Sequence, residues 1–229
     1  MSAAGPAEPR LAQGLALVFD MDGVLIDSNP LHVQAWEIFN RRYGLETTEA
    51  MRQDMYGRRN DEIVRAYYGD RLTPEEVVAR GAAKEELYRQ LAGDRIEEIL
   101  MPGLRAFLEC HRHDPMAVAS NAEPANVAFI LERAGLRDFF RVVVDGHQVH
   151  HPKPHPDIYL RTAELLRIAA ANCLVFEDSY AGIEAARAAG ARVIGVLTTH
   201  GDLPGAELTI DNFGSGKLEP WLRSQKPVL

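Results

Sequence analysis

Five short apolar runs, each closed or followed by a polar residue, constrain the fold of this chain more than any other feature of its sequence. A short run with so little charge inside it is typical of a strand that is buried on both faces of a parallel sheet. The segments between the runs have helical spacing, as Val127, Ile130 and Leu131 illustrate. Strands that alternate with helices in this way predict an α/β fold with a parallel sheet. The five runs are LALVF (15–19), MAVAS (116–120), RVVVD (141–145), CLVFED (173–178) and RVIGVL (192–197).

The periodicity changes after the first run, because about seventy residues then show helix signals and no buried strand. The clearest helix start is Thr73, which forms a capping box with Glu76, while Pro74 takes the first helical position. This helix is predicted to run to about Leu91. The block predicts an all-helical cap domain inserted into a Rossmann-like core. The expected boundaries are 1–14 for a flexible leader, 29–100 for the cap domain, and 15–28 with 101–229 for the core.

The charge balance excludes several classes of partner. Lys and Arg total 25 against 33 Asp and Glu, and the net charge of −8 has the wrong sign for a general nucleic-acid or anionic-membrane binder. The start of the sequence lacks a signal-peptide pattern, and no segment has the roughly 18 apolar residues of a membrane span. Its two cysteines, Cys110 and Cys173, form no CxxC pair. We therefore expect a cytoplasmic protein, a monomer or a weak homodimer, that acts on a small molecule.

Polar residues gather where the predicted strands end. In an open parallel sheet the carboxyl ends of the strands form the ligand crevice, so side chains at those ends are expected to meet. A single pair such as Asp20 and Asp22 is as often a solvated turn as a site, but four groups together indicate a site. The four groups are Asp20 with Asp22, Ser120, Lys153, and Glu177 with Asp178.

The acids of this crevice predict a metal ion. Asp20 and Asp22 point to one side if the extended backbone continues through Met21, and two carboxylates at that range need either a cation between them or a proton. Glu177 and Asp178 add further negative charge. Because oxygen ligands suit a hard divalent ion that keeps waters and binds phosphate, Mg²⁺ is the predicted cofactor.

A cation beside a lysine attracts phosphate, and this suggests a division of roles among the acids. Asp20 could act as a nucleophile that forms an aspartyl-phosphate, with Asp22 as the general acid and later the base that activates water. Ser120 either holds phosphoryl oxygens or simply caps the next helix. Lys153, between two prolines, either binds phosphate as a point charge or lies in a solvated loop.

Four segments in order resemble the motifs of the haloacid dehalogenase-like superfamily of aspartyl-phosphate phosphotransferases: DMDGVLIDS (20–28), ASN (119–121), KPHPD (153–157) and EDSYAGIEAARAAG (177–190). The resemblance covers nearly the whole chain. It is closest to the branch that includes β-phosphoglucomutase and small sugar-phosphate phosphatases, with a helical cap inserted after the first motif.

The resemblance implies a role for each matching residue. Asp20 becomes the nucleophile and a metal ligand, Asp22 becomes the acid and base that also offers its backbone carbonyl to Mg²⁺, and Asp178 becomes a metal ligand. Glu177 either binds the metal directly or holds the groups that do. Ser120 and Lys153 are expected to stabilise the phosphoryl group, and Asn121 is expected to contact the substrate beside them.

The implied activity is Mg²⁺-dependent hydrolysis of a phosphate monoester of a small, sugar-phosphate-like metabolite. A phosphomutase is the alternative, and a non-catalytic binding protein on the same scaffold is the third hypothesis. β-Phosphoglucomutases present Lys-Gly-x-x-Arg in the cap, where this chain has YGRRN (56–60). Beside Gly57, Arg58 or Arg59 either replaces the missing charge or faces solvent. His32 matches a histidine at the cap hinge and either contacts Asp22 or substrate, or lies on a helix surface.

Overall fold

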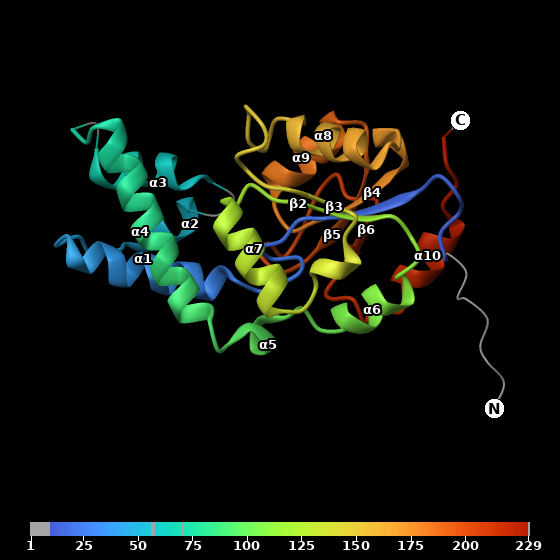
Figure 1. The fold of residues 1–229 in the computed structure, drawn as a ribbon, viewed down its shortest axis with the longest axis horizontal. Coiled ribbons are helices and arrows are strands. Elements are labelled where there is room, and N and C mark those ends of the chain that lie inside the picture. The colour runs from blue at the N-terminus through green and yellow to red at the C-terminus, as the bar shows by residue number, and fades with distance from the viewer. Residues whose placement is uncertain (1–9, 56–57, 70, 229) are drawn as a thin grey trace.

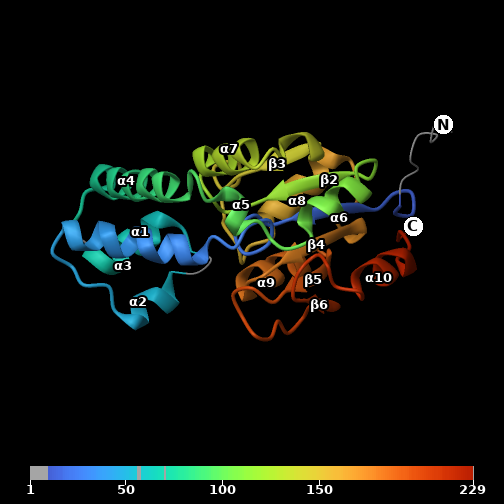
Figure 2. The same ribbon diagram turned by 90° about the horizontal axis from the view of Figure 1, so that it is seen from below.

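A six-stranded parallel sheet lies at the centre of the fold, with its strands in the order β3-β2-β1-β4-β5-β6 (Figures 1 and 2). The computed structural model describes residues 10–55, 58–69 and 71–228. All five apolar runs form strands, which confirms the predicted parallel α/β core. The strands are β1 (Ala16–Phe19), β2 (Met116–Ala119), β3 (Val142–Val144), β4 (Cys173–Glu177), β5 (Arg192–Val196) and β6 (Leu208–Ile210).

The sixth strand has no counterpart among the predicted runs. β6 lies at the edge of the sheet and pairs with β5 alone. Thr209 in its centre is exposed and Leu208 is half-buried, so the segment lacks the continuous apolar character by which the central strands stand out. An edge strand of this kind is invisible to a search for buried runs.

Helices cover both faces of the sheet, and the two faces have separate cores. Phe19 packs on one face in the core that contains residues of α6, α7 and α10, while Val18 packs on the other with residues of α8 and α9. This alternation along β1 is the period of two expected for a strand covered on both sides. The helices are α6 (Leu104–Cys110), α7 (Pro124–Arg133), α8 (Asp157–Leu166), α9 (Tyr180–Ala188) and α10 (Leu218–Ser224), with short 3₁₀ turns η1 (Arg137–Phe139) and η2 (Ala170–Asn172).

The segment between β1 and α6 forms helices, of which α1 to α4 lie together at one end of the molecule and α5 lies against the core (Figures 1 and 2). The predicted capping box is confirmed, since Thr73 accepts from the Glu76 N–H and the Glu76 side chain accepts from the Thr73 N–H. Helix α4 packs against α1 and α3, and Trp36 and Phe39 of α1 are buried there. The helices are α1 (Asn29–Arg42), α2 (Glu49–Asp54), α3 (Asn60–Tyr68), α4 (Pro74–Ala92) and α5 (Ile96–Ile99).

The two chain connections between this helical block and the sheet run side by side. Ile26 and Leu100 form an antiparallel bridge, and the Asp27 N–H donates to the Ile99 carbonyl at 2.7 Å. The Met101 N–H donates to the Leu25 carbonyl, which adds a second backbone hydrogen bond between the two connections. A block whose entry and exit lie together is what an inserted domain requires, and we keep 29–100 as its proposed extent.

The described part of the expected leader contacts the core. Leu11 is buried, and the backbone N–H groups of Arg10 and Leu11 donate to the Asp114 carboxylate. Residues 1–9 lie outside the described part of the chain. Within the residues that the structure describes, no helix has both the length and the apolar character that crossing a bilayer requires.

Candidate active site

The loop after β1 determines where the first two acids lie. The Asp20 N–H donates to the Phe176 carbonyl at 3.0 Å, which extends the pairing with β4 by one residue. The backbone then turns, because the Met21 carbonyl accepts from the N–H groups three to five residues onward, those of Val24, Leu25 and Ile26. The extended backbone therefore does not continue through Met21, contrary to the condition on which Asp20 and Asp22 would point to one side.

A glycine is required inside this turn. Gly23 has a φ of +77°, a region that side chains disfavour, and a Cβ there would lie 1.9 Å from Oδ2 of Asp178. The backbone of the first motif thus packs directly against the carboxylate of the fourth. The Asp178 carboxylate also accepts a hydrogen bond from the Thr199 hydroxyl, a contact that the strand pattern did not reveal.

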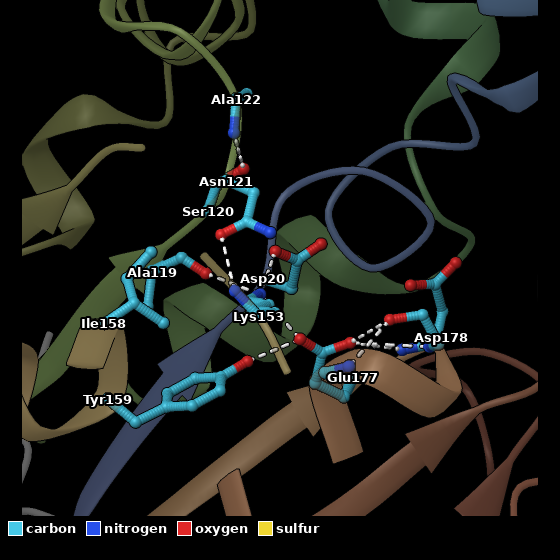
Figure 3. Close-up of polar contacts among 12 residues, drawn as sticks. Asp20, Ala119, Ser120, Asn121, Ala122, Lys153, Ile158, Tyr159, Glu177 and Asp178 are labelled. Atoms are coloured by element: carbon cyan, nitrogen blue, oxygen red, sulfur yellow. Dashed lines mark hydrogen bonds and ion pairs between the residues drawn. The ribbon is translucent and has the colours of Figure 1, made fainter. Parts of the chain in front are cut away.

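Three carboxylates from two adjacent strands form a buried cluster (Figure 3). Asp20 follows β1, Glu177 ends β4 and Asp178 follows it, so the pairing of β1 with β4 brings them together. Each contributes one oxygen to a group in which all ligand atoms lie within 4.8 Å of one another. These three positions are where the sequence predicted metal-binding acids.

Lys153 supplies positive charge to this cluster. Its ammonium donates to Asp20 Oδ1 and Glu177 Oε1, both at 2.6 Å, and to the Ala119 carbonyl at 3.1 Å (Figure 3). The solvated-loop alternative for Lys153 is thereby wrong, since the side chain is buried. Tyr159 of α8 donates a further hydrogen bond to Glu177.

One ammonium does not balance three buried carboxylates, and the pKa values reflect this. Burial raises the pKa of Asp20 to about 7; Lys153 opposes the rise, while the charges of Glu177 and Asp22 add to it. Burial, followed by the charges of Glu177 and Asp20, raises the pKa of Asp178 well above its usual range. An all-oxygen cluster whose ionised forms lack a counter-charge fits a hard divalent cation such as Mg²⁺.

Asp22 has a different environment. Its Oδ1 accepts from the Ser28 hydroxyl at 2.5 Å and lies 3.5 Å from His32 Nε2. Burial by itself would raise the pKa of Asp22, but the hydrogen bonds from His32 and from the Ser28 hydroxyl lower it. Ser28 holds the N-cap position of α1, but its hydroxyl makes no cap bond because it is directed to Asp22.

A chain of buried side chains continues from His32 into the cap helices. Lys84 Nζ lies 2.8 Å from His32 Nδ1, and it also donates to Glu85 Oε1 at 2.8 Å. Because an ammonium only donates, Nδ1 accepts and the ring proton sits on Nε2, facing Asp22. The His32 ring stacks on Tyr88 with centroids 3.9 Å apart. The helix-surface alternative for His32 is thereby wrong.

Sequence reasoning missed Lys84 and Glu85. Both are nearly fully buried, although they stand in the charged stretch AAKEEL, which is typical of a solvated helix face. The available signal was spacing, since Val77, Lys84 and Tyr88 lie on the same side of a helix by the 3.6-residue period. Val77 and Tyr88 are apolar or aromatic residues on this side of the helix, so their spacing indicated that Lys84, which lies between them, is buried as well.

The second motif lies at the carboxyl end of β2. Ser120 is buried, its backbone N–H donates to the Val144 carbonyl, and its Oγ accepts from the Ala122 N–H at 3.1 Å. The Asn121 side-chain oxygen accepts from the backbone N–H of Lys153 at 3.3 Å. Glu123 holds the N-cap position of α7, so Ser120 is not an ordinary helix cap.

A cavity of about 580 Å³ joins these groups. Arg58 contacts the cavity while paired with Asp54 and Glu62, and Arg59 Nη2 donates to the Gly146 carbonyl at 2.6 Å. Gly57, the third cap residue predicted to contact substrate, lies outside the described residues. The predicted site residues that line the cavity are Asp20, Asp22, His32, Arg58, Arg59, Ser120, Asn121, Lys153 and Asp178, with Glu177 buried behind them.

Residues 15–190 match the family model of the haloacid dehalogenase-like hydrolases. The chain belongs to this family. It is 33% identical over 180 residues to fructose-1-phosphate phosphatase YqaB of Escherichia coli, an alignment that covers 79% of this chain and 95% of that protein. It is 28% identical over 190 residues to a β-phosphoglucomutase of Bacillus subtilis, covering 79% and 82% of the two chains.

Solved structures support the same fold. The crystal structure of a β-phosphoglucomutase from Clostridium difficile superposes with a TM-score of 0.80 at 24% identity, covering 91% of this chain and 96% of that one. The resemblance recognised in the sequence motifs is therefore confirmed at the level of family and fold. Relatives named as phosphatases and as phosphoglucomutases identify the chain as an enzyme of this family.

Proposed function

We propose that this protein is a Mg²⁺-dependent phosphohydrolase that cleaves a phosphate monoester of a small, sugar-phosphate-like metabolite through an aspartyl-phosphate on Asp20. The observation that carries the proposal is the separation of two acids within one cavity. Asp20 lies in the carboxylate cluster against Lys153, whereas Asp22 is held by Ser28 and His32. Acids placed in different environments take different roles in catalysis.

Asp20 is the group that attacks phosphorus. Its hydrogen bond to Lys153 holds one carboxylate oxygen 2.6 Å from the ammonium. The same ammonium attracts the negative oxygens of the phosphoryl group, and Ser120, which follows β2, lines the same cavity. The P–O bond of the ester breaks as the Asp20–phosphorus bond forms. Water then attacks the phosphorus and restores the carboxylate.

Asp22 moves the proton in both halves of the reaction. Its lowered pKa keeps it ionised in the free protein, as required for the base that takes a proton from water. A phosphate dianion bound beside it favours its protonated form, as required for the acid that protonates the leaving oxygen. Ser28 and His32 hold the carboxylate in position through both steps.

The residues that would hold Mg²⁺ are Asp20, Asp178 and the backbone carbonyl of Asp22, with Glu177 binding directly or fixing Lys153. When bound, the ion would neutralise the cluster and withdraw charge from the phosphoryl oxygens. Gly23 and Gly182 leave room for the Asp178 and Glu177 side chains, because a Cβ at either glycine would overlap the carboxylate beside it.

A phosphomutase remains the second candidate, because relatives of both kinds share the fold. The chemistry is the same except that a sugar hydroxyl, in place of water, attacks the phosphoenzyme. Hydrolysis is favoured here because Arg58 and Arg59 of the cap already contact protein acceptors. Isomerisation of β-glucose 1-phosphate faster than release of phosphate would select the mutase.

The test is a phosphate-release screen with Mg²⁺ over sugar phosphates, polyol phosphates, phosphoglycolate and nucleoside monophosphates, with p-nitrophenyl phosphate as a generic ester. We expect turnover of at least one sugar phosphate that stops in excess EDTA. Full activity in EDTA, or turnover that survives Asp20→Asn, would contradict the mechanism. If no compound of the panel released phosphate, the hypothesis of a non-catalytic binding protein would be favoured.

A further inference from the structure

The cavity wall outside the carboxylate cluster carries balanced charge. We call the charged lining residues that do not belong to the strand-end motifs the outer wall. Among the residues that the structure describes, three of them are cationic and three anionic, so this part of the wall has no net charge to offer a ligand. They are Arg58, Arg59, Asp61, Lys84, Glu85 and Glu123.

Each cation of the outer wall has an acceptor among the described residues. Lys84 donates to Glu85 and contacts His32, both at 2.8 Å. Arg58 lies between α2 and α3 and is paired with one acid on each, Asp54 and Glu62. Arg59 donates to the Gly146 carbonyl at 2.6 Å. A phosphate arriving here would have to replace one of these contacts, which reduces what it gains.

Two acids of the outer wall, Glu85 and Glu123, are held in place by hydrogen bonds. Arg89 Nη1 donates to Glu123 Oε1 at 2.6 Å and to the side-chain oxygen of Asn126 at 2.7 Å, and Arg89 itself does not line the cavity. Asn126 Nδ2 donates in turn to Glu85 Oε2 at 2.6 Å, and Asn60 donates to Oε1. Glu123 therefore faces the cavity as a fixed carboxylate whose partner stands behind it.

The start of α7 is the place where a phosphate would otherwise bind, because backbone N–H groups at a helix N-terminus attract anions. Here Pro124 has no N–H, the Ala122 N–H donates to Ser120, and the N-cap side chain is the anionic Glu123. The end of the helix that favours anions in other folds thus begins with an anionic residue, whose carboxylate makes no cap bond and pairs with Arg89.

We infer that the outer wall receives the uncharged, hydroxylated part of a sugar or polyol monophosphate and rejects sugar bisphosphates, with Glu123 setting that discrimination. The inference rests on the proposed function and narrows its substrate class. Sugar hydroxyls donate to carboxylates such as Glu123 and Asp61, while the C–H face of the sugar packs on Trp36, Met55 and Val78, which also line the cavity. A second phosphate would place its charge beside a fixed carboxylate, where like charges repel.

The experiment compares matched pairs that differ in the second phosphate: fructose 1-phosphate with fructose 1,6-bisphosphate, and glucose 1-phosphate with glucose 1,6-bisphosphate. We expect kcat/KM to favour the monophosphate of the better pair by about tenfold or more. Glu123→Gln keeps the acceptor for Arg89 and removes the charge, so the preference should shrink at least about threefold. Glu132→Gln is the matched control, on an exposed position of the same helix outside the cavity lining.

Two results would overturn the inference while leaving the proposed hydrolase intact: bisphosphates turned over as well as monophosphates, or a preference that Glu123→Gln leaves at the wild-type value. Affinities of the same pairs for the Asp20→Asn variant, measured by calorimetry, must show the same preference independently of turnover. Failure to release phosphate from any pair and from p-nitrophenyl phosphate would instead reject the proposed function, and this inference with it.

Discussion

In the metal-free protein, Asp20 is expected to lower the free energy of unfolding, although the same residue is required for activity. Its pKa is raised from the usual 3.8 to about 7 by burial among like charges, even though Lys153 opposes the rise. Replacing it by Asn keeps an oxygen that can accept from Lys153 and removes the titrating charge. We therefore expect Asp20→Asn to be inactive and, without metal, more stable than the wild type.

The size of the effect follows from the gap between the two pKa values. Below pH 3.8 the carboxyl is protonated in both the folded and the unfolded chain, so it has no effect on the free energy of unfolding. Between pH 3.8 and about 7 only the unfolded chain loses the proton, and the free energy of unfolding falls as the pH rises. Above about pH 7 the loss is complete, at about 4 kcal/mol.

The assay is urea unfolding in EDTA at pH 5 and pH 8. The stability gain of Asp20→Asn should be about 4 kcal/mol at pH 8 and below about 2 kcal/mol at pH 5. Excess Mg²⁺ should reduce the gain, because ion binding stabilises the folded wild type. Asp138→Asn, at an exposed position before β3, is the control and should have no comparable effect. A variant no more stable than wild type at pH 8, or an equal gain at both pH values, would refute the reasoning.

Two further predictions concern the packing of the site. A Cβ on Gly182 would lie 1.9 Å from Cδ of Glu177, so Gly182→Ala should lower kcat about tenfold or more and destabilise the fold by about 1–3 kcal/mol. Gly216→Ala, where a Cβ meets nothing, is the control. An unchanged kcat in Gly182→Ala would contradict the prediction. Burial would raise the pKa of Glu85, but the charge and hydrogen bond of Lys84, with the hydrogen bond from Asn126, lower it from 4.5 to about 2. Glu85 therefore stabilises the fold above pH 4.5 by about 3 kcal/mol, and this is lost as the pH falls from 4.5 towards 2. Glu85→Gln should flatten that acid limb in urea titrations, and a limb as steep as that of the wild type would show that the carboxylate is not held this way.

The core strands and the strand-end acids were predictable because both are encoded locally. A strand such as β4, covered on both faces, must be apolar along its whole length, and a parallel sheet brings the residue after each strand to one edge. Knowledge of that edge alone places Asp20 near Asp178. The helical cap was predictable for a similar reason, since Thr73 and Pro74 mark a helix start without tertiary help.

The remaining parts depend on contacts between residues distant in the sequence. Lys84 is buried because His32, 52 positions away, accepts from it, and Glu85 is buried because Asn126, 41 positions away, donates to it. Ser28 follows the same principle, because its hydroxyl bonds to Asp22 where local preference favours a helix cap. Helical period and capping rules describe one element at a time, so they do not reveal partners that arrive from another.

The central claim is that Asp20 carries the phosphoryl group. Its most direct test is mass spectrometry of the wild-type protein quenched in acid during turnover of the best substrate from the screen, followed by proteolysis and mapping. We predict one added phosphoryl group on the peptide that contains Asp20, removed by Asp20→Asn. With p-nitrophenyl phosphate, whose leaving group needs no general acid, Asp22→Asn should increase the label, because only the attack of water is slowed. A substrate turned over with no label on Asp20, or with the label on another residue, would contradict the account.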